Sequence, residues 1–383
     1  MMRKLMIATL LLAIAAAGTA QARSARQRQL STQLGALFST VFHDDEPGAA
    51  VVLQHDGRTV YEQCFGWADA ATHAPVTPST RFCIASCSKQ FAAVAILQLA
   101  EQGKLSLSDP LSKYFPQFQA PFFKHITIHH ILSHTSGIPD ARPRTDRHFV
   151  LTATDVASVA YMDTLSYLNF TPGDGHYEYI NPTYQLCYQI IEQASGMPFE
   201  QYMARHVLGP AGMSHSQYFE AGRQMENAAH GYERDSVTGQ WREYDYGEES
   251  FFATKADGGL YTSITDFLKW ESALRHNVVL KPASRALAYT PWVTIPADAA
   301  YGYQPNTGYG YGFFIERTPG RRDIVYHTGD NGGFTIYAGK IPATSTVLLI
   351  FSTHPHYDRM QVVNKAYDII ASLCPQWIKA PTR

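Results

Sequence analysis

Three short groups of residues carry side chains that could take part in acyl transfer. The first is Ser86–Lys89, in which a serine precedes a lysine by three positions. On a helix this spacing places both side chains on one face, and a serine at the helix N-terminus lies where free N–H groups and the helix dipole favour developing negative charge. A lysine whose pKa is lowered by desolvation can take the hydroxyl proton. The spacing fits a serine nucleophile with a lysine base, although taken alone it also fits a helix cap beside a surface lysine.

The second group is Tyr179 and Asn181, just before an expected helix. A phenol can relay a proton to a leaving group, and an amide can hold a substrate carbonyl. The third group is His327, Thr328 and Gly329, at the end of an expected strand, where a substrate backbone could dock through main-chain hydrogen bonds. Each group by itself is also typical of ordinary loop and turn residues.

Hydrophobic periodicity predicts the elements that must position these groups. A helix is expected over residues 24–42, followed by a hairpin over 49–61 whose turn contains Asp56 and Gly57. A second helix is expected over 86–102, ending at Gly103. Its segment 91–97 is apolar on every side, which is typical of a helix in the middle of a fold.

Helices dominate the middle of the chain and strands return near its end. Helical periodicity covers 183–194 and 263–276, whereas short β-branched and aromatic runs predict strands at 309–316, 323–327, 333–340 and 345–351, before a last helix over 358–374. This order predicts an α+β fold in which one antiparallel sheet is built from both ends of the chain. We expect a discontinuous sheet domain over 30–110 and 290–375, with a mostly helical domain inserted over 111–289.

The N-terminus has the pattern of a secretory signal over residues 1–22. Arg3 and Lys4 precede a short apolar run, and Ala20 to Ala22 supply a small-x-small cleavage site. No later stretch of about 18 apolar residues follows. We therefore expect a periplasmic or secreted protein without a stable membrane anchor after cleavage.

Composition and spacing argue against several other classes of function. Lys and Arg number 31 against 33 Asp and Glu, so there is no basic excess for nucleic acid. His130 and His134 have the spacing of a zinc helix but lack the glutamate and an evident third ligand. Cys87 would point about 100° away from Ser86 on a helix. We expect no cofactor, no metal, and a monomer that acts on a small-molecule or peptide substrate.

The order S-x-x-K, Y-x-N, H-T-G resembles that of the serine β-lactamase and penicillin-binding-protein superfamily, most closely the class C β-lactamase and DD-peptidase group. Further segments extend the resemblance over residues 30–375: Pro47–Ala50, Ile84–Phe91, Leu132–Pro139, Gly258–Ser263 and Gly310–Gly312. The resemblance implies the β-lactamase/transpeptidase-like fold and hydrolysis through an acyl-enzyme.

It also implies a role for each matching residue. Ser86 would be the nucleophile, Lys89 would take its proton, and Tyr179 would share the acid–base work. Asn181 would orient Lys89 and the substrate amide, while His327, Thr328 and Gly329 would form a third wall. The oxyanion hole would be the N–H groups of Ser86 and Asp330. Whether Lys89 or Tyr179 is the base stays open.

One departure from the class C pattern concerns the third motif, which usually begins with lysine and here begins with His327. A histidine is largely neutral near pH 7, so we expect its protonation near pH 6 to favour carboxylate-bearing substrates. H-x-G resembles DD-peptidase, D-aminopeptidase and esterase-like members. The resemblance therefore implies an exported serine hydrolase of D-amino-acid peptides or esters, with a class C-type β-lactamase or a non-hydrolytic penicillin-binding sensor as alternatives.

Overall fold

The computed structural model describes residues 25–142, 146, 149, 152–220, 225–244, 254–296, 303–355 and 357–381. The signal predicted over residues 1–22 lies outside these ranges. Within them, no helix combines the length and the apolar character that crossing a membrane would need.

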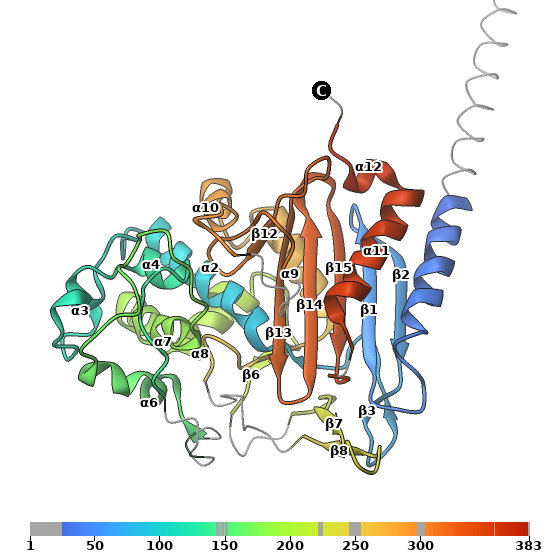
Figure 1. Cartoon of the computed structure of the whole chain (residues 1–383), viewed down its shortest axis with the longest axis horizontal. Coiled ribbons are helices and arrows are strands. Elements are labelled where there is room, and N and C mark those ends of the chain that lie inside the picture. The colour runs from blue at the N-terminus through green and yellow to red at the C-terminus, as the bar shows by residue number, and fades with distance from the viewer. Residues whose placement is uncertain are drawn as a thin grey trace, which may run out of the picture.

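The main sheet has eight antiparallel strands that come from both ends of the chain (Figure 1). The two ends of the chain meet where β1 pairs with β15, from Ala49 opposite Ser352 to His55 opposite Thr346. The predicted α+β fold, with one antiparallel sheet built from both ends, is confirmed. In spatial order the strands are β10 (Val293–Thr294), β11 (Thr307–Tyr309), β12 (Phe314–Glu316), β13 (Ile324–Asn331), β14 (Phe334–Ile341), β15 (Thr346–Ser352), β1 (Ala49–His55) and β2 (Arg58–Phe65).

Both faces of this sheet are covered, which explains why its central strands are apolar at successive positions. In β1, Ala50 and Val52 point into the core shared with the helical part. Val51 and Leu53 point into a second core, beneath the helix over residues 25–38 and the C-terminal helices α11 (Arg359–Leu373) and α12 (Pro375–Ile378). Side chains alternate between the faces of a strand, so each strand contributes to both cores.

Helices fill the other side of the sheet around α2 (Lys89–Glu101), whose residues from Lys89 to Leu99 are all buried. The uniformly apolar segment 91–97 therefore does lie in the middle of the fold. The remaining helices of this part are α3 (Leu111–Tyr114), η2 (Pro121–Lys124), α4 (Ile128–Leu132), α6 (Asp155–Val159), η3 (Ala160–Thr164), α7 (Asn181–Ser195), α8 (Phe199–Tyr202), η4 (Met203–Leu208), α9 (Ile264–Arg275) and α10 (Pro282–Ala288).

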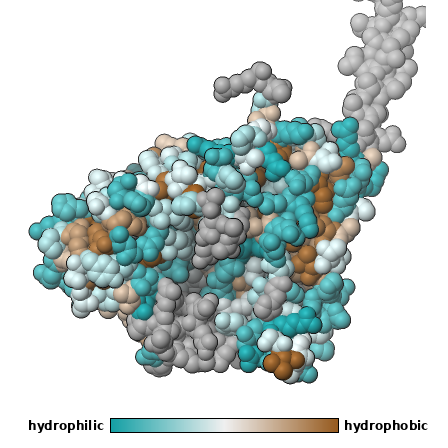
Figure 2. Space-filling model, viewed as in Figure 1, coloured by the Kyte–Doolittle hydropathy of each residue, from teal (hydrophilic) through white to brown (hydrophobic). Residues whose placement is uncertain are grey.

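Short strands and turns complete the structure. In the view of Figure 2 the surface is mostly hydrophilic, with small apolar patches at the α3 end of the helical part and near α11. The remaining elements are β3 (Trp67–Asp69) with β4 (Ala74–Pro75), β5 (Phe82–Cys83) with β9 (Leu260–Thr262) and β6 (Gln217–Tyr218), β7 (Tyr232–Arg234) with β8 (Trp241–Glu243), and the turn η5 (Pro342–Thr344).

Two elements differ from the sequence-based expectation. The helix expected over 86–102 begins as a separate 3-10 turn, η1 (Ala85–Ser88), before α2. The strand expected over 309–316 is split into β11 and β12 by a turn at Gly312, whose φ is +78°. A Cβ on Gly312 would lie 2.8 Å from the Gln90 Cα, so the close approach of α2 to this turn requires glycine.

Candidate active site

The turn η1 presents Ser86 at the base of a cavity. Ala85, just before it, has a φ of +45°, an uncommon conformation for a residue with a Cβ. The turn leads directly into α2, and Lys89, its first residue, places Nζ 3.0 Å from Ser86 Oγ. Cys87 is turned the other way, with its thiol toward the His327 carbonyl. Burial raises the pKa of that thiol, so the structure sets Cys87 apart from the cavity and from the base.

Lys89 is fully buried, and its ammonium has two further acceptors, Asn181 Oδ1 at 2.9 Å and the Asp257 carbonyl oxygen at 3.0 Å. Burial lowers the pKa of Lys89 to about 8, against the attraction of the Asp257 carboxylate. Amide and peptide oxygens only accept hydrogen bonds. A neutral Lys89 amine would thus donate its two N–H groups to the Asn181 and Asp257 oxygens and direct its lone pair at the Ser86 hydroxyl. This arrangement suits Lys89 as a proton acceptor.

The phenol of Tyr179 lies over the same site. Lys89 Nζ is 5.0 Å from the centre of the Tyr179 ring. Burial raises the pKa of Tyr179 well above its usual range, although the neighbouring Ser86 hydroxyl opposes the rise. The phenol oxygen is buried and has no hydrogen bond of good geometry to the described residues. At neutral pH Tyr179 is therefore a neutral phenol whose hydroxyl is available to donate a proton, and not a phenolate.

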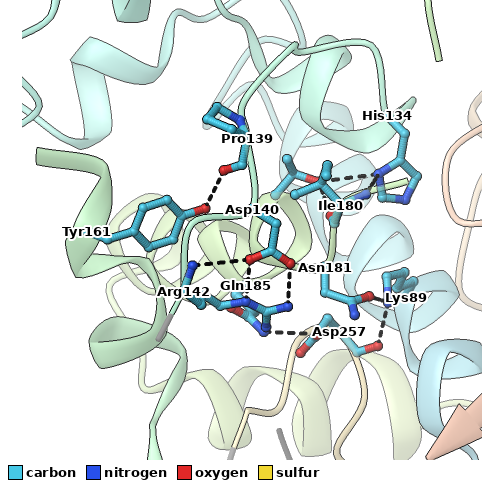
Figure 3. Close-up of polar contacts among 11 residues, drawn as sticks. Lys89, His134, Pro139, Asp140, Arg142, Tyr161, Ile180, Asn181, Gln185 and Asp257 are labelled. Carbon is cyan, nitrogen blue, oxygen red and sulfur yellow. Dashed lines mark hydrogen bonds and ion pairs between the residues drawn. The ribbon is translucent and has the colours of Figure 1, made fainter. Parts of the chain in front are cut away.

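His134 holds the segment that carries Tyr179 and Asn181, a role that the sequence analysis missed. The Ile180 N–H donates to His134 Nδ1 over 3.3 Å, as Figure 3 shows. The imidazole also packs against the Tyr179 ring, with the ring centres 4.4 Å apart. Burial lowers the pKa of His134 well below its usual value, so the ring is neutral and Nδ1 can accept. The segment Leu132–Pro139, singled out only for its resemblance, thus positions the second motif.

Asp257 and its neighbours form a buried polar cluster behind Lys89 (Figure 3). Gln185 Nε2 donates to Asp257 Oδ2 over 3.0 Å. Asp155 accepts hydrogen bonds from the N–H groups of Lys255 and Ala256, which fixes the loop segment that bears the Asp257 carbonyl. The sequence analysis did not identify Asp257; its only signal was its place directly before the matching segment Gly258–Ser263.

The third wall is the strand β13, which extends past the third motif to Asn331 because β14 pairs with it throughout. The neighbour on the other side, β12, pairs only up to Tyr326, so residues 327–331 have one edge that no described strand pairs with. Gly329 permits η1 to pack against this strand, because a Cβ there would lie 2.3 Å from the Ile84 carbonyl oxygen. The third motif lies within this strand and not at its end as expected, and it has a strand edge beside it.

The expectation that His327 becomes cationic near pH 6 is wrong. Its side chain is buried, its Nδ1 lies 2.6 Å from the Thr328 carbonyl oxygen and its Nε2 lies 3.0 Å from the Tyr309 hydroxyl. A carbonyl only accepts, so Nδ1 carries the proton and Nε2 accepts from the tyrosine. Burial, assisted by the charge of Lys89, lowers the pKa of His327 to about 3. The ring is a neutral, hydrogen-bonded part of the wall.

The positive charge of this wall comes instead from Arg359, the first residue of α11, which the sequence analysis did not single out. Its Nη1 donates to Asp330 Oδ1 over 2.7 Å and to the Gly329 carbonyl oxygen over 3.3 Å. An arginine at a helix start carries no sequence signal of its own, because only the packing of α11 on the sheet brings it to β13.

These residues surround a cavity of about 560 Å³. Of the predicted site residues, Ser86, Tyr179, Asn181, His327, Thr328 and Asp330 line it, whereas Lys89 lies beneath it and Gly329 packs behind it. The rest of the described lining is mostly aromatic and apolar, formed by Tyr177, Ile295, Pro296, Tyr303 and Phe314, together with Glu178. The cavity therefore suits a substrate with an apolar group next to the reacting carbonyl.

Other candidate chemistries find less support in the geometry. His129 lies near Tyr311, and His130 accepts from the Thr127 N–H at the start of α4. Within the described residues, no three His, Cys, Asp or Glu side chains come together as a metal site. All five cysteines are free thiols.

Comparison with known proteins agrees with this arrangement. The family Beta-lactamase matches residues 29–372. Penicillin-binding protein 4* of Bacillus subtilis (strain 168) is 27% identical over 350 residues, which cover 88% of this chain and 75% of that protein. The octameric penicillin-binding protein homologue from Pyrococcus abyssi superposes with a TM-score of 0.75 at 27% identity, over 90% of this chain and 77% of that chain.

A D-amino acid amidase from Ochrobactrum anthropi SV3 shares the fold, with a TM-score of 0.72 at 21% identity over 92% of this chain and 99% of the amidase. The hydrolase EstCE1 does so with a TM-score of 0.71 at 20% identity, over 91% of this chain and 98% of that chain. Since the family match spans nearly all of the described chain, this protein belongs to the Beta-lactamase family and is related to the penicillin-binding proteins.

Proposed function

We propose that this chain is an exported serine hydrolase that cleaves an amide or ester through an acyl-enzyme on Ser86. The observation that carries the proposal is the 3.0 Å contact between Lys89 Nζ and Ser86 Oγ, made by a lysine whose pKa is lowered to about 8. A buried amine with a pKa near neutral is matched to the task of a general base.

In acylation, neutral Lys89 takes the hydroxyl proton as Ser86 Oγ bonds to the substrate carbonyl carbon. The N–H groups of Ser86 and Asp330 stabilise the oxyanion. When the carbonyl–leaving-group bond breaks, Tyr179 donates its proton to the leaving group and regains one from the Lys89 ammonium. Water then attacks the acyl carbon by the same steps in reverse, which restores the free Ser86 hydroxyl.

For the substrate we propose D-amino-acid peptides, amides or small esters. Support comes from the apolar wall of the cavity and from a neutral His327 at the position where class C enzymes usually carry a lysine. The D-amino acid amidase and the hydrolase EstCE1 share the fold, which is compatible with a hydrolase that cleaves an amide. Export would follow from the predicted leader over residues 1–22, and mass spectrometry of the protein recovered from a secreting host should find a new N-terminus at Arg23.

The test is labelling and turnover of the chain from Arg23 onward. A fluorophosphonate probe should label the wild type and the matched variant Cys87→Ala, but not Ser86→Ala. A panel of p-nitrophenyl esters, D-amino-acid amides, D-peptides and a chromogenic cephalosporin then separates the substrates. Labelling without turnover of any of them would indicate an acylated sensor, and rapid cephalosporin hydrolysis would indicate a β-lactamase. Labelling that persists in Ser86→Ala would overturn the assignment of the nucleophile.

A further inference from the structure

The cavity wall contains an ion pair whose two members differ greatly in exposure. Arg359 Nη1 donates to Asp330 Oδ1 over 2.7 Å, with 14% of the arginine side chain exposed and 63% of the aspartate side chain. The arginine also donates to the Gly329 carbonyl oxygen. The cation is therefore fixed in the wall, whereas its carboxylate partner projects toward solvent and could be displaced.

The guanidinium is not saturated by these partners. Its Nε is buried and has no hydrogen bond to the described residues. Arginine prefers bidentate contact with a carboxylate through two N–H groups, whereas Arg359 contacts Asp330 through Nη1. The geometry around Arg359 thus resembles that of a carboxylate-binding arginine already occupied by a carboxylate of its own chain.

Negative side chains outnumber positive ones around the described part of the cavity. Its lining contains one positive side chain, Arg359, and two carboxylates, Glu178 and Asp330, while His327 is neutral. Glu178 accepts a hydrogen bond from the Asn169 amide. A substrate carboxylate would have to expel Asp330 from Arg359 and would then lie near two uncompensated negative charges.

We infer that the Asp330 carboxylate binds the Arg359 guanidinium in the place that a substrate carboxylate would otherwise take. The site therefore selects substrates that present an uncharged group, such as an ester or a carboxamide, next to β13. This inference rests on the proposed function of the same site. Asp330 would serve twice, through its backbone N–H in the oxyanion hole and through its side chain in specificity. Removing the charge of its side chain should convert Arg359 into a receptor for substrate carboxylates.

The experiment compares two substrates that differ only in one charge: a chromogenic D-alanyl depsipeptide whose leaving group bears a free carboxylate, and its methyl ester. In Asp330→Asn, the ratio of kcat/KM for the acid to that for the methyl ester should rise about tenfold, the scale of one charge-assisted hydrogen bond. Using the ratio cancels any equal effect on the oxyanion hole.

Two variants supply the controls. Asp368→Asn removes the same charge from an exposed aspartate that pairs with Arg321, and should leave the ratio unchanged. Asp330→Asn combined with Arg359→Gln should return the ratio to its wild-type value. An unchanged ratio in Asp330→Asn, or a gain that survives Arg359→Gln, would overturn the inference.

A second readout does not require turnover. Inhibition constants for phenylboronic acid and 3-carboxyphenylboronic acid, which both bind a serine nucleophile, should diverge in Asp330→Asn in favour of the carboxylated compound. If wild type is labelled by the fluorophosphonate and these ratios do not move, the specificity inference fails while the proposed hydrolase stands. If wild type is neither labelled nor active, the proposed function itself fails.

Discussion

At the scale of single residues, the site depends on burial that sets protonation states. Burial lowers the pKa of Lys89 to about 8 and raises that of Tyr179 well above its usual range. At neutral pH the lysine can therefore lose its proton more easily than the tyrosine. For the mechanism proposed above, these shifts favour Lys89 as the base, with Tyr179 as the donor to the leaving group.

This assignment predicts the pH profile of the reaction. For a neutral ester, kcat/KM should rise about tenfold per pH unit below about pH 8 and level off above it, because only deprotonated Lys89 accepts the Ser86 proton. Tyr179→Phe should lower kcat by roughly 10²–10⁴ and leave the rising limb in place. Steady-state kinetics from pH 5.5 to 9.5 check both points. A Tyr179→Phe profile without the rising limb would assign the titration to the phenol.

The protonation of His327 gives a separate prediction. Its pKa of about 3 keeps the ring neutral throughout the physiological range. The KM of a carboxylate-bearing substrate relative to its methyl ester should therefore stay constant between pH 7.5 and 5.5. Measuring both KM values at each pH removes the effect of Lys89, which acts on the two substrates alike. If the KM of the acid alone falls toward pH 6, His327 is protonated in that range and this prediction is wrong.

At the scale of elements, the site forms where one tight turn, η1, packs against one strand, β13. The turn η1 carries Ser86, and β13 passes directly behind it at Gly329. The residues of the second motif join them from the start of α7, held by His134. Because these elements come from distant parts of the chain, the proposed mechanism implies that a small shift between η1 and β13 would displace Ser86 from the oxyanion hole.

Gly329→Ala tests this packing. The new Cβ would lie 2.3 Å from the Ile84 carbonyl oxygen, so η1 and β13 must separate. A displacement of this kind should lower kcat by about 10²-fold, and calorimetry should find a lower Tm. Gly35→Ala is the matched control, since its Cβ would meet side-chain atoms only at 3.6 Å and beyond. Wild-type kcat in Gly329→Ala would mean that the contact does not position Ser86.

At the scale of the whole molecule, the sheet separates two cores, and the site draws on both. The core on the helical side includes α2, which begins beneath Ser86, whereas Ile295 and Phe314 of the cavity wall belong to the other core. The core on the outer face lies beneath the helix over residues 25–38 and α11, and contains Leu34, which is fully buried. Of the helix over residues 25–38 and α11, only Arg359 is among the described residues that line the cavity.

Leu34→Ala should therefore affect stability and not chemistry. Removing a fully buried leucine side chain costs roughly 2–5 kcal/mol in the free energy of unfolding. Denaturant titration should find this loss, while kcat/KM measured well below the Tm stays at the wild-type value. A large fall in kcat/KM would show that the outer core transmits strain to the cavity.

The amino-acid sequence by itself determined the α+β fold, because periodicity shows which segments are strands and which are helices. It also pointed to Ser86, Lys89, Tyr179 and Asn181, through the order of three motifs that resembles a known superfamily, because the spacing within each motif alone also fits ordinary caps and turns. It missed the break at Gly312, because the turn there is required by the approach of α2, a contact between segments far apart in the chain.

The tertiary structure alone decided the electrostatics of the site. Whether His327 is charged depends on its burial and on the Tyr309 hydroxyl, neither of which its own neighbours in the sequence reveal. Asp257, His134 and Arg359 enter the site through contacts across the fold. A pKa is set by everything that surrounds a group in space, whereas a sequence motif records only what lies next to it along the chain.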